Sequence, residues 1–242
     1  MSGPIPAPWR RQAPNGPVSE DQTETNGPAS KGRAEAGGVH ASVRQAASLL
    51  LLYPGDDWPQ RIRLVEQALA PLPGPAAPLR EFCTRTGPAD PLQLAADYVS
   101  TFDRSRRRTL HMTYYLDGDT RRRGASLARI KELYRAHGWL CGAEELPDFL
   151  PLMLEFSARC PGPGERLLGE HAPGLRLLAS ALEHFGSPYA DVLGAVLSTL
   201  PEPTPAQLRR VRAVAEAGPP TESVGLAPYP PTAGHAERGA HA

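Results

Sequence analysis

Four carboxylates gather around one proline-containing turn of the chain. They are Glu144, Glu145, Asp148 and Glu155. Spacings of three and seven residues put the last three on one side of a helix, where carboxylates can transfer protons or bind a hard cation. Such sites also need a partner base, a nucleophile or further ligands, and the sequence identifies none. A favourable interaction with a helix N-terminus explains Glu145 and Asp148 without any chemistry, and we favour this interpretation.

The histidines and cysteines do not form a recognisable catalytic set. His111, His137 and His171 are far apart and have no G-x-S-x-G motif near them, and we expect His137 to be a core residue bonded to a backbone carbonyl. The cysteines are odd in number and widely spaced, which argues against a disulfide framework and a zinc site: Cys83, Cys141 and Cys160. No phosphate-binding glycine motif is present either. The sequence predicts a protein that is not an enzyme and has no metal or cofactor of its own.

Arginines form two clusters that could bind carboxylates or phosphates, because a guanidinium offers a rigid fork of donors. One cluster contains Arg104, Arg106, Arg107 and Arg108, and the other comprises residues 121–123. A solvated surface explains them equally well. Lys+Arg and Asp+Glu number 26 each, so the whole chain has no net attraction for nucleic acid or an anionic membrane. A helical DNA-binding regulator that uses these arginines remains the alternative function.

Apolar residues recur at helical spacing between residues 39 and 217, and no useful strand alternation appears. We therefore predict an all-α single domain, a bundle of about eight to ten helices. Helix starts are expected at Asp57, Asp90-Pro91, Thr120, Pro147-Asp148 and Thr204-Pro205. The longest apolar run is far shorter than the roughly 20 residues of a membrane span, and no export signal can be assembled, so we expect a cytoplasmic protein.

Proline and glycine, 28 and 23 residues in all, are concentrated at the two ends of the chain. Residues 1–38 and 218–242 offer little apolar surface to offset the entropy lost on ordering. Both segments are therefore expected to be disordered tails around the helical domain.

A set of short motifs lies within roughly residues 43–200 and is densest between Tyr98 and Phe156. It comprises Tyr53-Pro54, Phe102-Asp103-Arg104, Leu110-His111, Gly118-Asp119 with Arg121, Arg123 and Gly124, Glu145-Leu146-Pro147-Asp148, Leu150-Pro151 and Leu154-Glu155-Phe156. In these motifs the chain resembles the nitrate reductase assembly chaperones, a branch of the helical chaperones that mature molybdenum-containing reductases. Members of the wider family often have His after the Pro-Asp pair, where this chain has Phe149, so no role of that histidine can be transferred.

The resemblance implies a cytoplasmic, non-catalytic chaperone. Its partner would be the apo catalytic (alpha) subunit of respiratory nitrate reductase, recognised through its N-terminal segment. Holding that subunit would let the molybdenum cofactor enter and delay docking to the membrane partner. Molybdenum cofactor biosynthesis proteins are further partners suggested by the resemblance, whereas nucleic acid binding and stable membrane insertion are not expected.

An unusually apolar helix next to clustered charge suggests where the client would bind. A groove between helices suits an amphipathic segment, with apolar anchors for affinity and charged rims for orientation. We expect a client site made of Asp103, Arg104, Arg107, His111, Glu145, Asp148, Phe149, Leu152, Met153 and Phe156.

Overall fold

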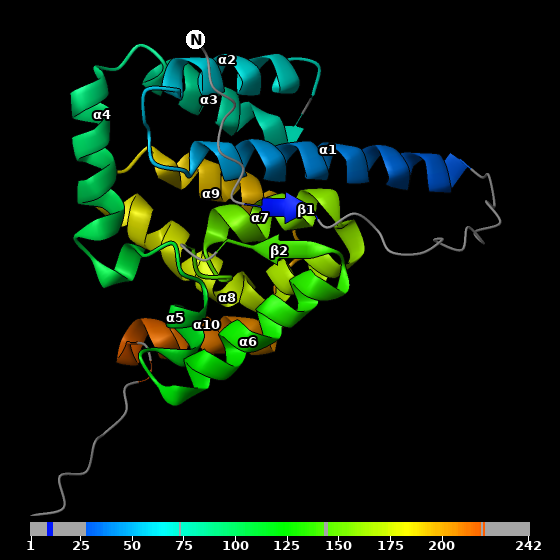
Figure 1. Ribbon diagram of the computed structural model, residues 1–242, viewed down its shortest axis with the longest axis vertical. Helices are drawn as coiled ribbons and strands as arrows, with labels where there is room; N and C mark the ends of the chain where they lie inside the picture. Colours follow the sequence, from blue (N-terminus) through cyan, green and yellow to red (C-terminus); the bar gives the residue numbers. More distant parts are fainter. Residues whose placement is uncertain (1–8, 12–27, 73, 143–144, 219, 221–242) are drawn as a thin grey trace, which may run out of the picture.

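The computed structural model describes residues 9–11, 28–72, 74–142, 145–218 and 220. Over these residues the chain is almost entirely helical (Figure 1), which confirms the predicted all-α fold. Its α-helices are α1 (Pro28–Leu50), α2 (Trp58–Leu69), α3 (Ala77–Thr86), α4 (Pro91–Tyr98), α5 (Thr113–Asp117), α6 (Arg121–Ala136), α7 (Leu150–Arg159), α8 (Pro161–Phe185), α9 (Tyr189–Ser198) and α10 (Pro205–Ala217). Shorter turns are η1 (Gly74–Ala76), η2 (Val99–Asp103) and η3 (Arg106–Arg108), and the strands are β1 (Trp9–Arg11) and β2 (Trp139–Cys141).

Helix α7 lies at the centre of the core. It packs against α1 on one side and α8 on another, and α9 closes the core against α1, α3 and α8. A helix surrounded by neighbours must be apolar nearly all round, and the buried residues of α7 include Leu150, Leu152, Met153, Leu154 and Phe156, all with no exposed surface. The apolar character of this segment is therefore a consequence of its central position.

Close approach of α7 and α8 depends on a small residue. A Cβ atom added at Gly164 of α8 would lie 2.2 Å from the Cα atom of Ser157 on α7. At Gly169 on the same helix, an added Cβ would meet nothing within 4 Å. The two helices can therefore pack at their observed distance only with glycine at position 164.

The side chain of Arg44 on α1 is buried, with only 1% of its surface exposed. Its guanidinium donates to the hydroxyl and the carbonyl of Thr199 at 3.0 and 2.8 Å, and to the hydroxyl of Ser157 at 3.1 Å. A fourth contact, at 3.3 Å, is an ion pair with the half-exposed Glu165 of α8. Burial lowers the pKa of Arg44, which the interaction with Glu165 partly opposes. One cation thus joins α1, α7, α8 and the end of α9.

Several predicted helix starts are confirmed. Asp90 accepts a hydrogen bond from the amide of Gln93, and Thr204 forms a reciprocal capping box with Gln207 at the start of α10. Asp57 precedes α2 as expected, but its carboxylate pairs with Arg61 and does not cap the helix. The prediction that a helix starts at Pro147-Asp148 is wrong, since α7 begins at Leu150.

The ends of the chain differ in part from the expected tails. Residues 9–11 form strand β1, and α1 already begins at Pro28, inside the segment expected to be disordered. The remaining positions of 1–27, and residues 219 and 221–242, lie outside the described residues. Strand β1 pairs with β2 in an antiparallel two-stranded sheet, although no strand was predicted. Within the part of the chain that the structure covers, no helix is both long and apolar enough to span a membrane.

Candidate functional site

Two segments distant in the sequence are joined by a short antiparallel bridge. His111 lies opposite Phe149, and the bridge is flanked by two backbone hydrogen bonds. The amide of Met112 donates to the carbonyl of Asp148 at 3.0 Å, and the amide of Leu150 donates to that of Leu110 at 2.8 Å. Residues 147 and 148 form a turn, and the bridge holds Phe149 in an extended conformation, which explains why α7 begins only at Leu150.

The carboxylate of Asp148 is fully buried at this bridge. A buried charge is costly unless hydrogen bonds compensate it. Thr113 supplies two, from its amide at 3.1 Å and from its hydroxyl at 2.5 Å, and Nδ1 of His111 lies 3.2 Å from the other carboxylate oxygen. Burial alone would raise the pKa of Asp148, but the bonds from His111 and Thr113 outweigh it and hold the pKa below its usual value. Asp148 is therefore an ionised anchor.

Arg123 connects this anchor to the start of α6. Its Nε donates to the hydroxyl of Thr113 at 3.2 Å, and its Nη2 lies 3.8 Å from the carboxylate of Asp148. Arg123 also pairs with Asp119 at 3.4 Å, and Asp119 pairs with the exposed Arg106 at 2.6 Å. Alternating charges therefore run from the buried Asp148 to the surface.

A polar cleft of about 190 Å³ opens where these groups meet. It is lined by Arg106, Thr109, His111, Tyr114, Asp119 and Arg123. Guanidinium, imidazole, hydroxyl and phenol groups can all donate hydrogen bonds, so the cleft is suited to a carboxylate or another polar group of a ligand. The ring of Phe149 is half-buried and lies 5.6 Å from that of His111, centre to centre, which adds an apolar neighbour to the cleft.

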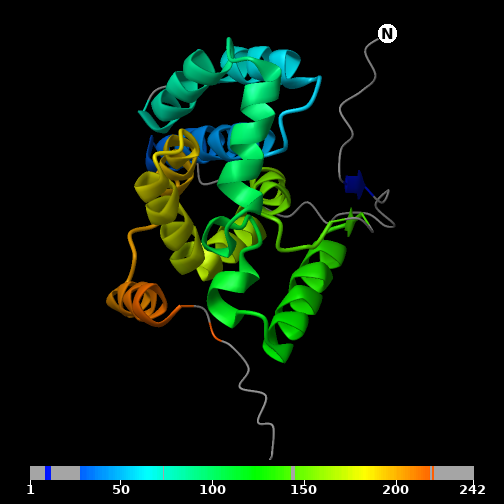
Figure 2. The same ribbon diagram turned by 90° about the vertical axis from the view of Figure 1, so that its left-hand side faces the viewer.

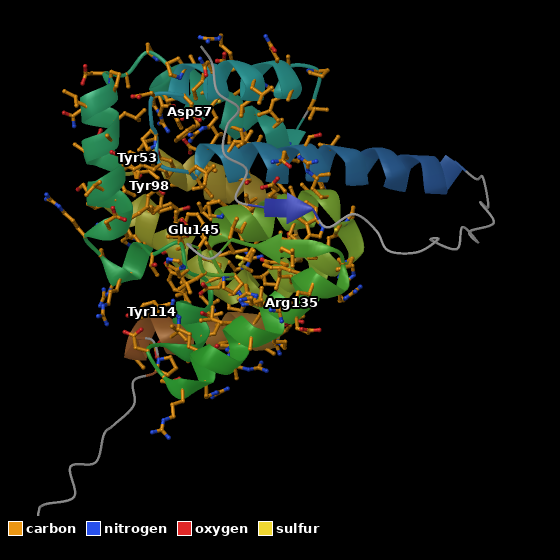
Figure 3. The ribbon with its side chains drawn as sticks, in the orientation of Figure 1. Tyr53, Asp57, Tyr98, Tyr114, Arg135 and Glu145 are labelled. Carbon is orange, nitrogen blue, oxygen red and sulfur yellow. The ribbon has the colours of Figure 1, made fainter. Side chains whose placement is uncertain are left out.

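The structure brings together only part of the predicted site. His111, Asp148 and Phe149 are adjacent, but Glu145 is exposed in the loop before them. Figure 3 shows Tyr114 of the cleft near α5 and α10, with Glu145 higher up beside β2. Asp103, Arg104 and Arg107 are exposed around η2 and η3 and do not line the cleft, in which Arg106 takes the place expected of Arg107.

The apolar half of the predicted site is part of the core. Leu152, Met153 and Phe156 have no exposed surface, so in this structure they do not form the wall of an open groove. Contact between these three residues and a client stays a prediction that would require α7 to move. The expectation that His137 is a core residue is also wrong: its side chain is exposed, although Nδ1 does lie 2.9 Å from the carbonyl oxygen of Leu133.

An apolar groove of about 390 Å³ lies elsewhere, between α1, α2 and α7. Its walls include Ala46 and Leu49 from α1, Leu64 and Ala68 from α2, and Ala158 from the far end of α7. The sequence does not predict this groove, because small residues create space only when their helices face one another, and periodicity does not show which helices do so.

Several residues of the polar cleft were also missed as site residues. In the sequence, Asp119 and Arg123 belong to the motifs of the family resemblance, and Arg106 belongs to an arginine cluster, but none of the three is predicted as a site residue. Thr109 and Tyr114 had no signal of their own, because hydroxyl groups become informative only through the partners that the fold provides. The described residues contain no group of three or more His, Cys, Asp or Glu side chains placed to hold a metal ion.

Comparison with known proteins gives these features a context. The family model described as nitrate reductase delta subunit matches residues 66–194, just over half of the chain. The nitrate reductase-like protein NarX of Mycobacterium tuberculosis is 39% identical over 167 residues, which cover 68% of this chain but only 25% of that protein. This chain therefore spans about a quarter of the length of that relative.

Other relatives are named as assembly chaperones. The probable nitrate reductase molybdenum cofactor assembly chaperone NarJ of Bacillus subtilis is 36% identical over 64% of this chain and 86% of its own length. NarJ of Escherichia coli K12 is 36% identical over 45% of this chain and 46% of its own. A crystal structure of a putative redox enzyme maturation protein from Archaeoglobus fulgidus has a TM-score of 0.49 and 24% identity, covering 65% and 91% of the two chains. Because the family model matches more than half of its residues, the chain belongs to the nitrate reductase delta subunit family.

Proposed function

We propose that this protein is a chaperone for respiratory nitrate reductase. It binds the apo catalytic subunit through that subunit's N-terminal segment, keeps it open for insertion of the molybdenum cofactor, and delays docking to the membrane partner. Support comes from family membership and from relatives named as molybdenum cofactor assembly chaperones. The alternative, a DNA-binding regulator, gains no support from these relatives.

The observation that carries the proposal is the polar cleft built on Asp148. Two of its donor residues, His111 and Arg123, are held by the buried carboxylate of Asp148, which favours a cleft that is formed before any ligand arrives. A preformed site loses less conformational entropy on binding than a flexible one. We assign the cleft to a charged group of the client segment and the half-buried Phe149 to an apolar side chain beside it. Arg104 and Arg107, exposed nearby in the chain, orient the approaching segment through their charge.

Holding the client segment also delays docking of the catalytic subunit to its membrane partner. A segment bound to the chaperone cannot at the same time contact the membrane partner, so docking waits until the chaperone leaves. Release must then follow cofactor insertion, because a folded catalytic subunit no longer offers the same segment. The chaperone needs no catalytic group for this cycle.

Calorimetric titration with a peptide covering the client's N-terminal segment tests the proposal, with a scrambled peptide as control. Saturable one-to-one binding of the authentic peptide alone is expected. Arg106→Ala should weaken this binding, whereas Arg129→Ala should not, although both arginines are exposed and pair with one carboxylate. Charge reversal by Arg104→Glu and Arg107→Glu should weaken binding without changing helicity or melting temperature.

The same titration separates the cleft from the apolar groove. Leu64→Ser alters an exposed residue of the groove, and Leu92→Ser is a matched control at an exposed leucine outside it. If Leu64→Ser abolishes binding and Arg106→Ala does not, the client binds between α1, α2 and α7 and our assignment of the cleft is wrong. Absence of binding by both the peptide and the whole apo subunit would refute the chaperone proposal.

A further inference from the structure

Strand β2 pairs with a distant part of its own chain. The antiparallel register places Trp9 opposite Cys141, Arg10 opposite Leu140 and Arg11 opposite Trp139. Figures 1 and 2 agree that the two strands lie on one face of the molecule, outside the helical core and beside α6. Among the residues that the structure places, β1 is the only strand with which β2 forms a sheet.

Strand β2 is held in place by contacts independent of β1. Gly138, with φ of 73°, turns the chain out of α6 into the strand. Trp139 is 4% exposed and its ring packs edge-on against Phe156, 6.2 Å between centres. At the other end, the thiol of Cys141 donates to the carbonyl of Glu145 at 3.3 Å. Leu140 between them is exposed. The edge of β2 is therefore preformed.

Pairing between three residues is weak by itself. Each backbone hydrogen bond gives only a small net gain, which ordering of the paired residues opposes. The attachment of β1 to α1 through residues 12–27 offsets this weakness by raising its local concentration near β2. A separate extended segment can form the same backbone bonds and replace β1 if its side chains contribute more.

We propose that the edge of β2 accepts an extended segment of the client by strand addition, and that Trp9–Arg11 occupy this edge in cis as a competitor. The occupant in the structure indicates the form of the partner: an extended segment that pairs antiparallel with β2 through its backbone. Backbone bonding to a strand edge is an established mode of peptide recognition. The identity of the client in this inference rests on the proposed function. The strand-accepting edge of β2 does not depend on it.

Hydrogen exchange measured by mass spectrometry on the full chain tests the cis pairing. The double variant Arg10→Pro and Arg11→Pro removes two successive amides. Because successive residues of a strand point in opposite directions, at least one of these amides faces β2. The amides of Trp139–Cys141 should exchange faster in this variant. The matched variant Arg10→Ala and Arg11→Ala keeps both amides and should retain the protection. Unchanged exchange in the proline variant would overturn the proposal.

Two peptides then test the acceptor edge in trans. A synthetic copy of residues 5–15 of this chain should restore protection of β2 in the proline variant. The client's N-terminal peptide should do the same, and should bind the proline variant more tightly than the unaltered chain. The gain is on the order of tenfold if β1 fills the edge about nine-tenths of the time, because the affinity scales with the fraction of free sites.

The outcomes distinguish this inference from the proposed function. Equal affinity of the client for both proteins, together with loss of protection in the proline variant, would show that the client binds elsewhere and would refute strand addition by the client. If the client binds neither protein, the proposed function fails, and the peptide of residues 5–15 still decides whether β2 accepts a strand. Failure of that peptide to restore protection would refute the acceptor edge itself.

Discussion

The pairing of Asp148 with its neighbours shows how a buried charge is maintained at the scale of single residues. Its partners come from two other parts of the chain: His111 and Thr113 precede or begin α5, and Arg123 lies in the first turn of α6. No one of them is near Asp148 in the sequence. Removing the charge would leave several donors without an acceptor, and such a loss costs more than the same bond contributes when formed.

We expect Asp148→Asn to lower the free energy of unfolding by about 1–3 kcal/mol, because the donors of Thr113 and His111 lose a charged acceptor. Urea denaturation at neutral pH measures this change. Asp103→Asn is the control: its carboxylate is exposed, and the change should stay within about 0.5 kcal/mol. Equal effects of the two substitutions would show that Asp148 does not anchor the cleft.

The same pair of proteins should differ in their response to acid. The folded state holds the pKa of Asp148 below its usual 3.8, so the unfolded chain takes up the proton first as the pH falls. The stabilisation by Asp148 is therefore complete above about pH 5 and disappears as the pH drops through the folded-state pKa. We expect the difference between wild type and Asp148→Asn to shrink in urea titrations between about pH 5 and pH 3. A difference that stays constant over this range would contradict the assignment.

At the scale of secondary-structure elements, glycine and arginine set the distances between helices. Gly164 permits the backbone of α8 to approach that of α7. Arg44 fills the space between α1, α7, α8 and α9 with a hydrogen-bonded cation. Substitution of Gly164 or Arg44 should therefore change the stability of the protein more than the same substitution at a less constrained glycine or arginine.

Gly164→Ala should destabilise the protein by about 1–3 kcal/mol, because the new methyl group meets the backbone of Ser157 and the helices must move apart. Gly169→Ala, in open space on the same helix, should instead stabilise by about 0.5–1 kcal/mol through improved helix propensity. Thermal denaturation of both variants tests the pair. Stabilisation by both changes would mean that α7 and α8 do not pack this closely.

Arg44→Ala should cost about 3–5 kcal/mol, since it empties a buried site and leaves polar groups of Ser157 and Thr199 without their partner. Arg44→Lys should fall in between, because an ammonium keeps the charge but cannot reproduce the planar fork. The exposed Arg166 on α8 provides the control, with an expected change within about 0.5 kcal/mol for Arg166→Ala. Urea denaturation gives all three values, and a small effect at Arg44 would contradict its role.

At the scale of the whole molecule, stability should be uneven. Helix α7 is surrounded by other helices, whereas α10 has no buried residue and packs against α8 from outside. Hydrogen exchange rates follow such differences in local burial. We expect the amides of α7 to be the slowest to exchange and those of α10 to be among the fastest of the helical segments. Equal protection of α7 and α10 would show that the chain opens only as a single unit.

The sequence predicted the architecture better than the site, for physical reasons. The helix starts at Asp90 and Thr204 could be predicted from the sequence, because capping acts between residues three positions apart. The apolar run of α7 was correctly identified, but its periodicity could not tell a binding surface from a helix buried on all sides. The partners of Asp148 were not predictable either, because they join the carboxylate from positions about 25 to 37 residues away. Strand β1 was missed because three residues are too few for a pattern.

The buried position of Arg44 also determines when, during synthesis of the chain, the core can close. Arg44 is made before Thr199, which accepts two of its hydrogen bonds and lies 155 residues later in the chain. While the protein is growing on the ribosome, α1 can form as a helix but its guanidinium must stay in water. The core can close around it only after α9 has emerged. A nascent chain stalled before Thr199 should therefore expose α1 and the face of α7 that packs on it, and only chains in which α9 has left the ribosome should resist proteases there.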